Sequence, residues 1–149
     1  KFCYLHLVTD AFSRMIIGYI LAPTLEAKYT IEALQQAISH AGSGNLCGTI
    51  HHSDRGVQYC CDEYITLLKE HHIRISMTED SNPTDNGMAE RVNGIIKNEF
   101  LEPLQTPKNL LEALPLVDHA VRTYNMLRPH LNLNMRTPAQ VYEGKQIIL

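Results

Sequence analysis

Two acidic residues stand out because of where they occur along the 149-residue chain. Asp54 follows a short β-prone segment, residues 49–52, and Glu90 falls in the first turn of a helix expected over 87–100. Carboxylates at the carboxyl ends of strands in an α/β sheet lie where ligands usually bind, and their oxygens suit Mg²⁺. Each acid alone also fits an ordinary structural role, a turn or a solvated helix face.

The expected helix has two distinct faces. Glu90, Asn93 and Lys97 follow one another at i, i+3 and i+7, which places a carboxylate, an amide and an ammonium along one line. The opposite face is apolar and consists of Met88, Val92, Ile95, Ile96 and Phe100. The polar face therefore presents three different polar groups on one side of the helix, a pattern that an ordinary solvated helix face also shows.

The net charge of −3 argues against a simple basic clamp for nucleic acid. The charge is uneven, however, because residues 1–90 sum to −5 and residues 91–149 to +2. An acidic half joined to a mildly basic half fits a carboxylate–metal site beside a phosphate-binding surface, although many other proteins share the pattern.

Composition excludes several classes of protein. With 44% hydrophobic residues the chain is no disordered segment, and no apolar stretch approaches the roughly 20 residues of a membrane span. The four cysteines contain no C-x-x-C pair, which favours free thiols in a reducing cytosol. The chain has no visible signal peptide and opens without Met, so we expect a cytoplasmic protein of which this is a fragment.

Apolar runs and turn residues predict an α/β domain with a mixed sheet flanked by helices. Residues 2–9 and 15–21 are expected to form an antiparallel hairpin, with Gly18 interrupting the second run. Short strands are expected over 49–52 and 74–77, the latter after a helix that Asp62 caps and that turns Ile65, Leu68 and His72 inward.

Four helical segments complete the prediction. Ile31, Leu34, Ile38 and Ala41 form an apolar stripe over 26–41. The 87–100 helix follows a polar loop, and a long helix begins near Thr106-Pro107 and is kinked or split at Pro115. A short helix starts near Pro138.

The combination of these features resembles the catalytic core of retroviral-type integrases and the related transposases of bacterial insertion sequences. Asp54 and Glu90 are separated by 35 residues, the spacing of the last two acids in the D-D-(35)-E triad of that superfamily. The motifs that carry the resemblance span nearly the whole chain: Tyr4-Leu5, Asp10 to Arg14, His52 to Gly56, Asn82 to Asn93, Tyr124-Asn125, Arg128 to His130 and Thr137 to Ala139.

The resemblance implies an RNase H-like fold and roles for individual residues. Asp54 and Glu90 match the second and third metal-binding acids, and Lys97 matches a helix lysine that holds DNA near the cleavage point. Asn93, Arg91 and Arg55 are weaker candidates for DNA contacts, and Arg128 and His130 fit a structural role better than a functional one.

The first acid of the triad is not matched in the chain. In the family it lies on the preceding strand, in an Asp-x-Thr context, and that strand would precede Lys1. Asp10 is the alternative, but it matches a strand-to-turn aspartate that is not a ligand, and we expect it to cap the turn near Ser13 and Arg14. The fragment would then lack one ligand and be inactive by itself.

The resemblance also implies a cofactor and partners. Two Mg²⁺ or Mn²⁺ ions would activate the attacking oxygen and stabilise the leaving one at a DNA phosphate. The expected function is cleavage of transposon ends and strand transfer into target DNA, by a homo-oligomer assembled on DNA, away from membranes, in the bacterial cytoplasm at the nucleoid. The alternatives are a catalytically inactive DNA-binding or dimerising module of a decayed element, or an RNase H-like nuclease.

Overall fold

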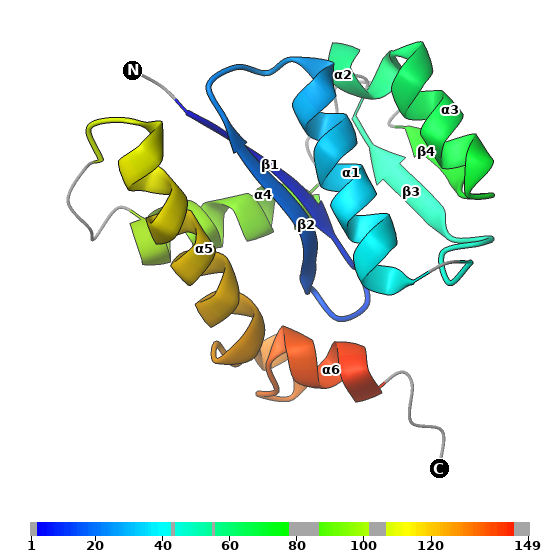
Figure 1. Ribbon diagram of the computed structural model, residues 1–149. Helices are drawn as coiled ribbons and strands as arrows, with labels where there is room; N and C mark the ends of the chain where they lie inside the picture. Colours follow the sequence, from blue (N-terminus) through cyan, green and yellow to red (C-terminus); the bar gives the residue numbers. More distant parts are fainter. Residues whose placement is uncertain (1–2, 43, 55, 78–86, 102–106, 145–149) are drawn as a thin grey trace. The chain divides into compact units, whose positions relative to one another are not determined.

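The computed structural model describes residues 3–42, 44–54, 56–77, 87–101 and 107–144, in two compact units (Figure 1). One unit contains residues 9–16 and 91–149, and the other contains residues 2–8 and 17–90. Within the described ranges no helix is both long and apolar enough to cross a membrane.

The first two strands form the predicted hairpin. β1 (Tyr4–Thr9) and β2 (Ile16–Ala22) are hydrogen bonded to each other, and so short a connection forces them to run antiparallel (Figure 1). β2 passes through Gly18, the residue that interrupts the apolar run in the sequence. A Cβ built on Gly18 would lie 2.2 Å from the carbonyl oxygen of Ala33, so glycine lets the strand approach the next helix closely.

That helix, α1 (Ala27–Ala41), begins one residue after the predicted start and covers the strands with a buried face. The buried side chains are Thr30, Ala33, Leu34 and Ala37. Of the predicted stripe, Leu34 is buried, while Ile31 and Ile38 are partly buried against the core cluster of Leu34, Tyr64, Leu68 and Ile73. The helical period was therefore predicted correctly, and small residues on the same side permit the close contact with β2.

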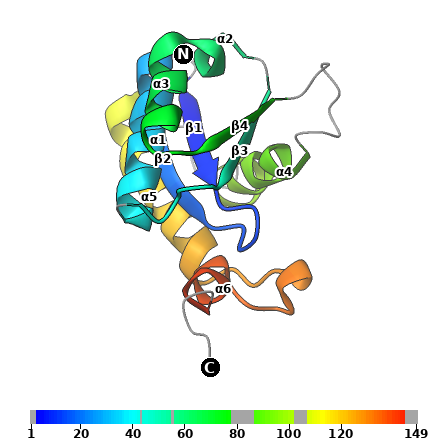
Figure 2. The same ribbon diagram turned by 90° about the vertical axis from the view of Figure 1, so that its right-hand side faces the viewer.

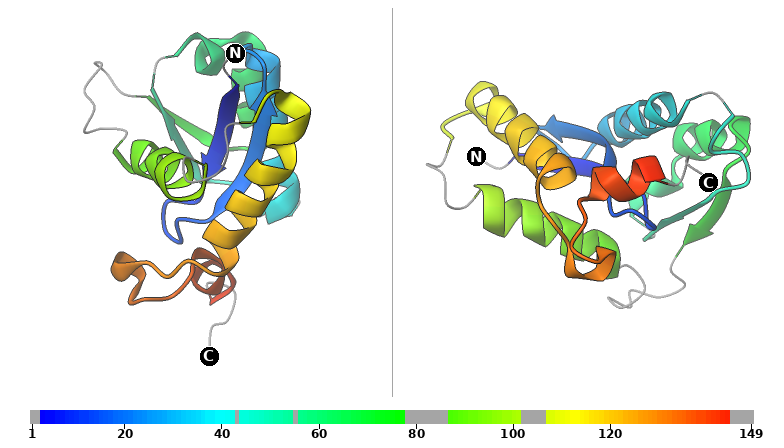
Figure 3. Two further views of the ribbon diagram at one scale, coloured as in Figure 1. Left: turned by 90° about the vertical axis from the view of Figure 1, so that its left-hand side faces the viewer. Right: turned by 90° about the horizontal axis from the view of Figure 1, so that it is seen from below.

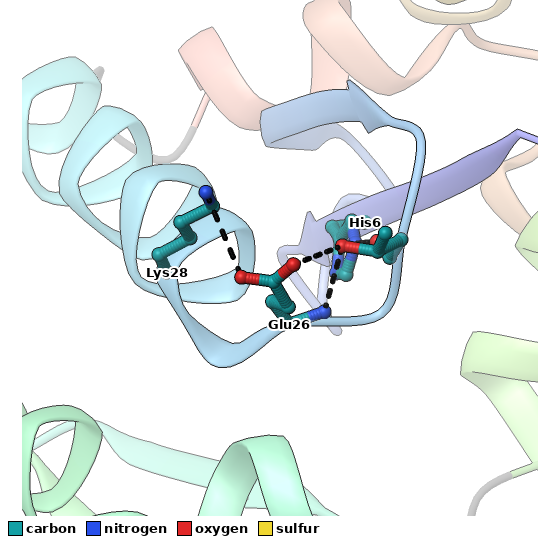
Figure 4. A network of polar contacts seen from close by, with 4 residues as sticks. His6, Glu26 and Lys28 are labelled. Carbon is teal, nitrogen blue, oxygen red and sulfur yellow. Dashed lines mark hydrogen bonds and ion pairs between the residues drawn. The ribbon is translucent and has the colours of Figure 1, made fainter.

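A polar network fixes the start of α1, where Glu26 provides no side-chain cap (Figure 4). The Thr24 hydroxyl donates to Glu26 at 3.1 Å, and Lys28 pairs with the other Glu26 oxygen at 3.6 Å. The buried ring of His6 on β1 contacts the Thr24 carbonyl at 3.3 Å and the Thr30 hydroxyl at 3.0 Å. His6 thus satisfies both ring nitrogens within the fold, as a buried polar group requires.

β3 (Ile50–Ser53) and β4 (Arg74–Met77) form a parallel pair (Figure 2). The connection runs through two helices, α2 (Val57–Cys60), which the sequence did not predict, and α3 (Asp62–Glu70). A parallel pair needs such a crossover. The register aligns Ser53 with Met77.

Two details of α3 correct the prediction. Asp62 is its first residue rather than its cap, because Cys61 occupies the cap position and no side chain bonds there. His72 is exposed at a positive φ of 55° after the helix ends, so it does not point inward, and Tyr64 is buried instead. Leu68 is buried as predicted.

The predicted single mixed sheet is found as two separate two-stranded sheets, β1–β2 and β3–β4. The antiparallel and parallel pairings of a mixed sheet are both present, but no strand of the described segments hydrogen bonds to both pairs.

The remaining helices are α4 (Gly87–Ile95), continued by the π-helical segment η2 (Ile96–Leu101), then α5 (Leu110–Met126), the 3-10 turn η3 (Leu131–Leu133) and α6 (Pro138–Gly144). The predicted helix 87–100 and the start of the last helix at Pro138 are confirmed.

α5 corrects two expectations. It begins at Leu110, not near Thr106-Pro107, because Asn109 accepts the Glu112 N–H at 2.9 Å as an N-cap. Thr106 itself lies outside the described residues. Pro115 does not split α5, which continues as one helix (Figure 3). Proline removes one helical hydrogen bond, and the buried Val117, Ala120 and Val121 keep the helix together.

Candidate catalytic and DNA-binding site

Asp54 lies directly after β3 with an exposed side chain. Its Oδ1 accepts the backbone N–H of Gly56 at 2.7 Å, which is the turn that an Asp-x-Gly sequence favours. A Cβ on Gly56 would stand 2.8 Å from this oxygen and 2.9 Å from the side-chain oxygen of Gln58. Glycine therefore both holds the carboxylate by its N–H and leaves room for it.

Aromatic side chains support the turn of Asp54 from within the same unit. The Tyr64 hydroxyl is hydrogen bonded to Nε2 of His51 on β3 at 2.7 Å, and Tyr59 packs edge-on against Tyr64. Burial raises the pKa of Tyr59, and the negative charge of Asp54 raises it further. The sequence analysis missed this cluster, because helix α2 that positions Tyr59 was not predicted.

Burial lowers the pKa of His51, so the folded protein favours its neutral ring. Its Nδ1 is buried without a hydrogen-bond partner among the residues that the structure describes. His52, by contrast, is exposed and contacts the Ser76 hydroxyl at 3.1 Å. His52, the histidine closest in sequence to Asp54, is therefore held by a contact within the fold rather than arranged as a metal ligand.

Glu90 lies in the first turn of α4 and is exposed. Asn93 and Lys97 are exposed as well, whereas Val92 and Ile96 are buried. The two faces predicted for this helix are thus confirmed. Arg91 is also exposed, and Arg55 lies outside the described residues.

Asp10 is engaged in the turn between β1 and β2. Its Oδ2 accepts the Ser13 hydroxyl at 2.6 Å and the Ser13 N–H at 3.0 Å, and the Arg14 N–H donates to the Asp10 carbonyl at 2.8 Å. The predicted capping role of Asp10 near Ser13 and Arg14 is therefore confirmed.

Tyr124 and Asn125 form hydrogen bonds with this same turn, and all of these residues belong to one unit. The Tyr124 hydroxyl donates to the Arg14 carbonyl at 2.8 Å. The buried Asn125 side chain accepts the Ile16 N–H and donates to the Ile16 carbonyl, both at 2.9 Å. Arg14 adopts a positive φ of 67°, which costs a non-glycine residue energy unless neighbours hold it there.

The other signature residues also make internal contacts. Arg128 forms a two-pronged ion pair with Glu99, with both nitrogen–oxygen distances at 2.7 Å. His130 packs edge-on against the ring of Tyr124, and burial lowers the pKa of His130. The structural role expected for Arg128 and His130 is supported by these contacts.

The chemistry of the acids suits a hard divalent cation. Asp54 and Glu90 are exposed carboxylates, and Asp54 accepts the Gly56 N–H through Oδ1. The described residues hold no group of three or more histidine, cysteine, aspartate or glutamate side chains placed to bind one ion. The convergence of Asp54 with Glu90 stays a prediction, and the segment 78–86 before α4 lies outside the described residues.

Comparison with known proteins identifies the family. Residues 1–83 and residues 71–138 each match a family described as "Integrase core domain". A Mycobacterium tuberculosis protein of insertion sequence element IS986/IS6110 is 36% identical over 105 residues, covering 68% of this chain and 38% of that protein. Transposase InsF for insertion sequence IS3A of Escherichia coli is 29% identical, covering 97% of this chain and 49% of InsF.

Solved structures confirm the predicted fold class. The HTLV-2 integrase catalytic core domain in complex with magnesium superposes with a TM-score of 0.71 and 28% identity, covering 93% of this chain and 83% of that one. The α/β, RNase H-like class is therefore established, with helices flanking small sheets. The chain spans only about half or less of the curated relatives it matches. By sequence match and by fold, it belongs to the integrase core domain family.

Proposed function

We propose that the chain is the catalytic core of a DNA transposase, which cleaves DNA at the ends of its element and transfers the cut strand to a target. The observation that carries the proposal is the integrase core match over residues 1–83, joined to two exposed acids at family spacing, one after β3 and one at the start of α4. Relatives of the chain are named as transposases.

Asp54 and Glu90 would act as two of the carboxylates that hold Mg²⁺ or Mn²⁺. When bound, two such ions supply Lewis acidity that activates an attacking oxygen and stabilises a leaving one. The magnesium complex of the HTLV-2 integrase core supports the use of a divalent metal. Asp54 keeps Oδ2 for a ligand while Gly56 orients Oδ1.

Asp10 is a poor candidate for the remaining ligand. Two donors of Ser13 already occupy its Oδ2, and moving the carboxylate toward an ion would break the turn that Tyr124 and Asn125 hold. We therefore assign the first acid to a part of the full-length protein outside residues 1–149, in keeping with relatives about twice as long as this chain.

DNA would contact the exposed polar face of α4. Lys97 supplies a phosphate contact, and Asn93 and Arg91 are neighbouring donors. Arg55, beside Asp54 in the sequence, is proposed as a further backbone contact. In the full-length protein, Lys97→Ala should weaken DNA binding and reduce the salt slope by about one unit. Lys69→Ala, which removes an exposed lysine of α3, is the matched control. An equal loss of DNA affinity in both variants would remove Lys97 from the interface.

We further propose that the protein works as a homo-oligomer on DNA in the bacterial cytoplasm. The HTLV-2 integrase core is described in a dimeric form, which supports an assembly of copies. Sedimentation of the full-length protein with and without DNA tests this directly, since a single copy on a DNA end at working concentration would contradict it.

The experiment that tests the function uses the full-length protein and labelled DNA carrying the ends of its element. Cleavage that needs Mg²⁺ or Mn²⁺, followed by joining of the 3′ end to a second DNA, is the predicted result. Cleavage without joining would instead indicate an RNase H-like nuclease. DNA binding with neither reaction would indicate an inactive module. Glu90→Gln should abolish both reactions and leave folding unchanged, and full activity of that variant would contradict the proposal.

A further inference from the structure

The helix that carries Glu90 changes type just before Lys97. Residues Ile96–Leu101 form a π-helical segment, η2, that continues α4. The π-helix is rare because its hydrogen bonds run from i to i+5, and single π turns inside α-helices occur frequently at functional sites. A wider turn also rotates the residues after it relative to those before it, so the segment that starts at Ile96 sets where Lys97 points.

An ion pair with Arg128, which follows the C-cap of α5, holds this segment. Arg128 Nε lies 2.7 Å from Glu99 Oε2, and Arg128 Nη2 lies 2.7 Å from Glu99 Oε1. Such a two-pronged pair fixes direction as well as distance. The hydrogen bonds from Arg128 lower the pKa of Glu99, and the same hydrogen bonds raise the pKa of Arg128.

Arg128 is itself fixed at its base. Its backbone N–H donates to the Thr123 carbonyl at 3.0 Å, at the end of α5. Within the last turn of α5, Tyr124 and Asn125 bond to the backbone of Arg14 and Ile16. Tyr124, Asn125 and Arg128 thus connect the end of α5 to two segments that are distant in sequence, residues 14–16 and η2.

We propose that Arg128 is a positioning residue, which grips Glu99 to fix the helix segment that presents Lys97 and continues the helix of Glu90. The assignment rests on the proposed function. A direct DNA contact is disfavoured, because Nε and Nη2 are taken by Glu99 and Nη1 is directed at the Pro129 carbonyl at 3.4 Å.

The test combines four variants with two kinds of measurement. Arg128→Met removes the pair, Arg128→Lys keeps the charge without the fork, and Glu99→Arg with Arg128→Glu exchanges the charges. Arg122→Met removes one exposed charge of α5 as the control. Amide hydrogen exchange over 96–101 is measured in the chain itself, and DNA affinity and cleavage rate in the full-length protein.

We expect Arg128→Met to lose exchange protection over 96–101 and to slow cleavage by roughly 10- to 100-fold, with DNA affinity reduced no further than in Lys97→Ala. Arg128→Lys should fall between, the charge exchange should recover at least about tenfold of the lost rate, and Arg122→Met should behave as the native protein.

Three results would overturn the proposal. Unchanged exchange over 96–101 would show that the pair does not hold η2. Weakened DNA binding with no recovery on charge exchange would make Arg128 a phosphate contact. Lower thermal stability with a native cleavage rate per folded molecule would leave only a structural role. Failure of the proposed function is separate, since it is read from Glu90→Gln, while hydrogen exchange needs no activity.

Discussion

Asp10 and Asp54 occupy similar places in the sequence, each directly after a strand and before a turn, yet the structure uses them in opposite ways. Asp10 is half-buried and accepts two hydrogen bonds from Ser13 through one oxygen. Asp54 is exposed and accepts one bond, from the Gly56 N–H. The residues that follow each aspartate account for the difference. Ser13, three residues after Asp10, donates two hydrogen bonds to its carboxylate, whereas Gly56, two residues after Asp54, donates one from its backbone.

The surroundings of the two turns differ in the same sense. The Asp10 turn is held by Tyr124 and Asn125, more than a hundred residues later. The Asp54 turn is held locally, by the Gly56 N–H two residues later. The Asp10 turn is therefore fixed by long-range hydrogen bonds, whereas the Asp54 turn exposes its carboxylate to solvent.

The largest expected effect separates the two aspartates by activity. Asp54→Asn should lower metal-dependent cleavage by the full-length protein by about 1000-fold or more, since several kcal/mol of ion-dependent stabilisation are lost. Its stability should change by less than about 0.5 kcal/mol, as for other exposed sites. Cleavage of labelled DNA and urea unfolding measure the two quantities.

Asp10→Ala should show the converse pattern, with a loss of about 1–3 kcal/mol in stability because the Ser13 donors lose a charged acceptor. The cleavage rate per folded molecule should stay near native. If Asp10→Ala abolished cleavage in a folded protein while Asp54→Asn did not, the assignment of roles to the two acids would be reversed.

The next effect tests the clamp on the Asp10 turn. Asn125→Ala leaves the N–H and carbonyl of Ile16 without their buried partners and should destabilise the chain by roughly 2–4 kcal/mol. Asn109→Ala, which removes only the N-cap of α5, is a matched control and should cost about 1 kcal/mol. Equal losses in chemical denaturation would mean that Asn125 is no special anchor.

A smaller effect sharpens the description of the Asp54 turn. Gly56→Ala places a Cβ where Asp54 Oδ1 and the Gln58 side chain now lie, so the carboxylate must move. Affinity for Mn²⁺ should fall by roughly 10-fold, as when outer partners of a metal ligand are lost. Gly144→Ala, at the end of α6 with open space around the Cβ position, is the control for metal affinity. Native Mn²⁺ affinity in Gly56→Ala would show that the close approach is dispensable.

The smallest effect concerns pH. Burial lowers the pKa of His51 below its ordinary 6.5, so the unfolded chain binds this proton first. The contribution of neutral His51 to stability is complete above about pH 6.5 and declines as pH falls toward the lowered folded-state pKa. Unfolding free energies at pH 7.5 and pH 5.5 should differ less in His51→Gln than in the native chain, and an equal difference would exclude His51 as the source.

Local patterns predicted much of the fold and the face of the site helix. The alternation of apolar runs predicted the hairpin and the short strands, and the spacing of Val92 and Ile96 correctly predicted which side of α4 is buried. The Asp-x-Gly and Asp-x-x-Ser sequences already favoured the turns that hold Asp54 and Asp10, because both depend on neighbouring residues.

Long-range contacts could not be predicted in the same way. The Glu99–Arg128 pair joins residues 29 positions apart, and nothing in either local sequence names the partner. The same holds for Asn125 with Ile16 and for the close approach of Gly18 to Ala33, where a glycine that resembles a strand breaker instead allows packing. The division into two small sheets depends on which strand edges hydrogen bond to each other, and the sequence of a single strand does not specify this.

The central claim is that Asp54 and Glu90 meet around divalent cations, and paramagnetic broadening by Mn²⁺ tests it most directly. In ¹⁵N-labelled chain, substoichiometric Mn²⁺ should broaden amide signals near Asp54 and near Glu90 together, at one concentration, and both Asp54→Asn and Glu90→Gln should weaken the broadening at both places. Broadening confined to one of the two acids, or unaffected by substitution of the other, would contradict the claim.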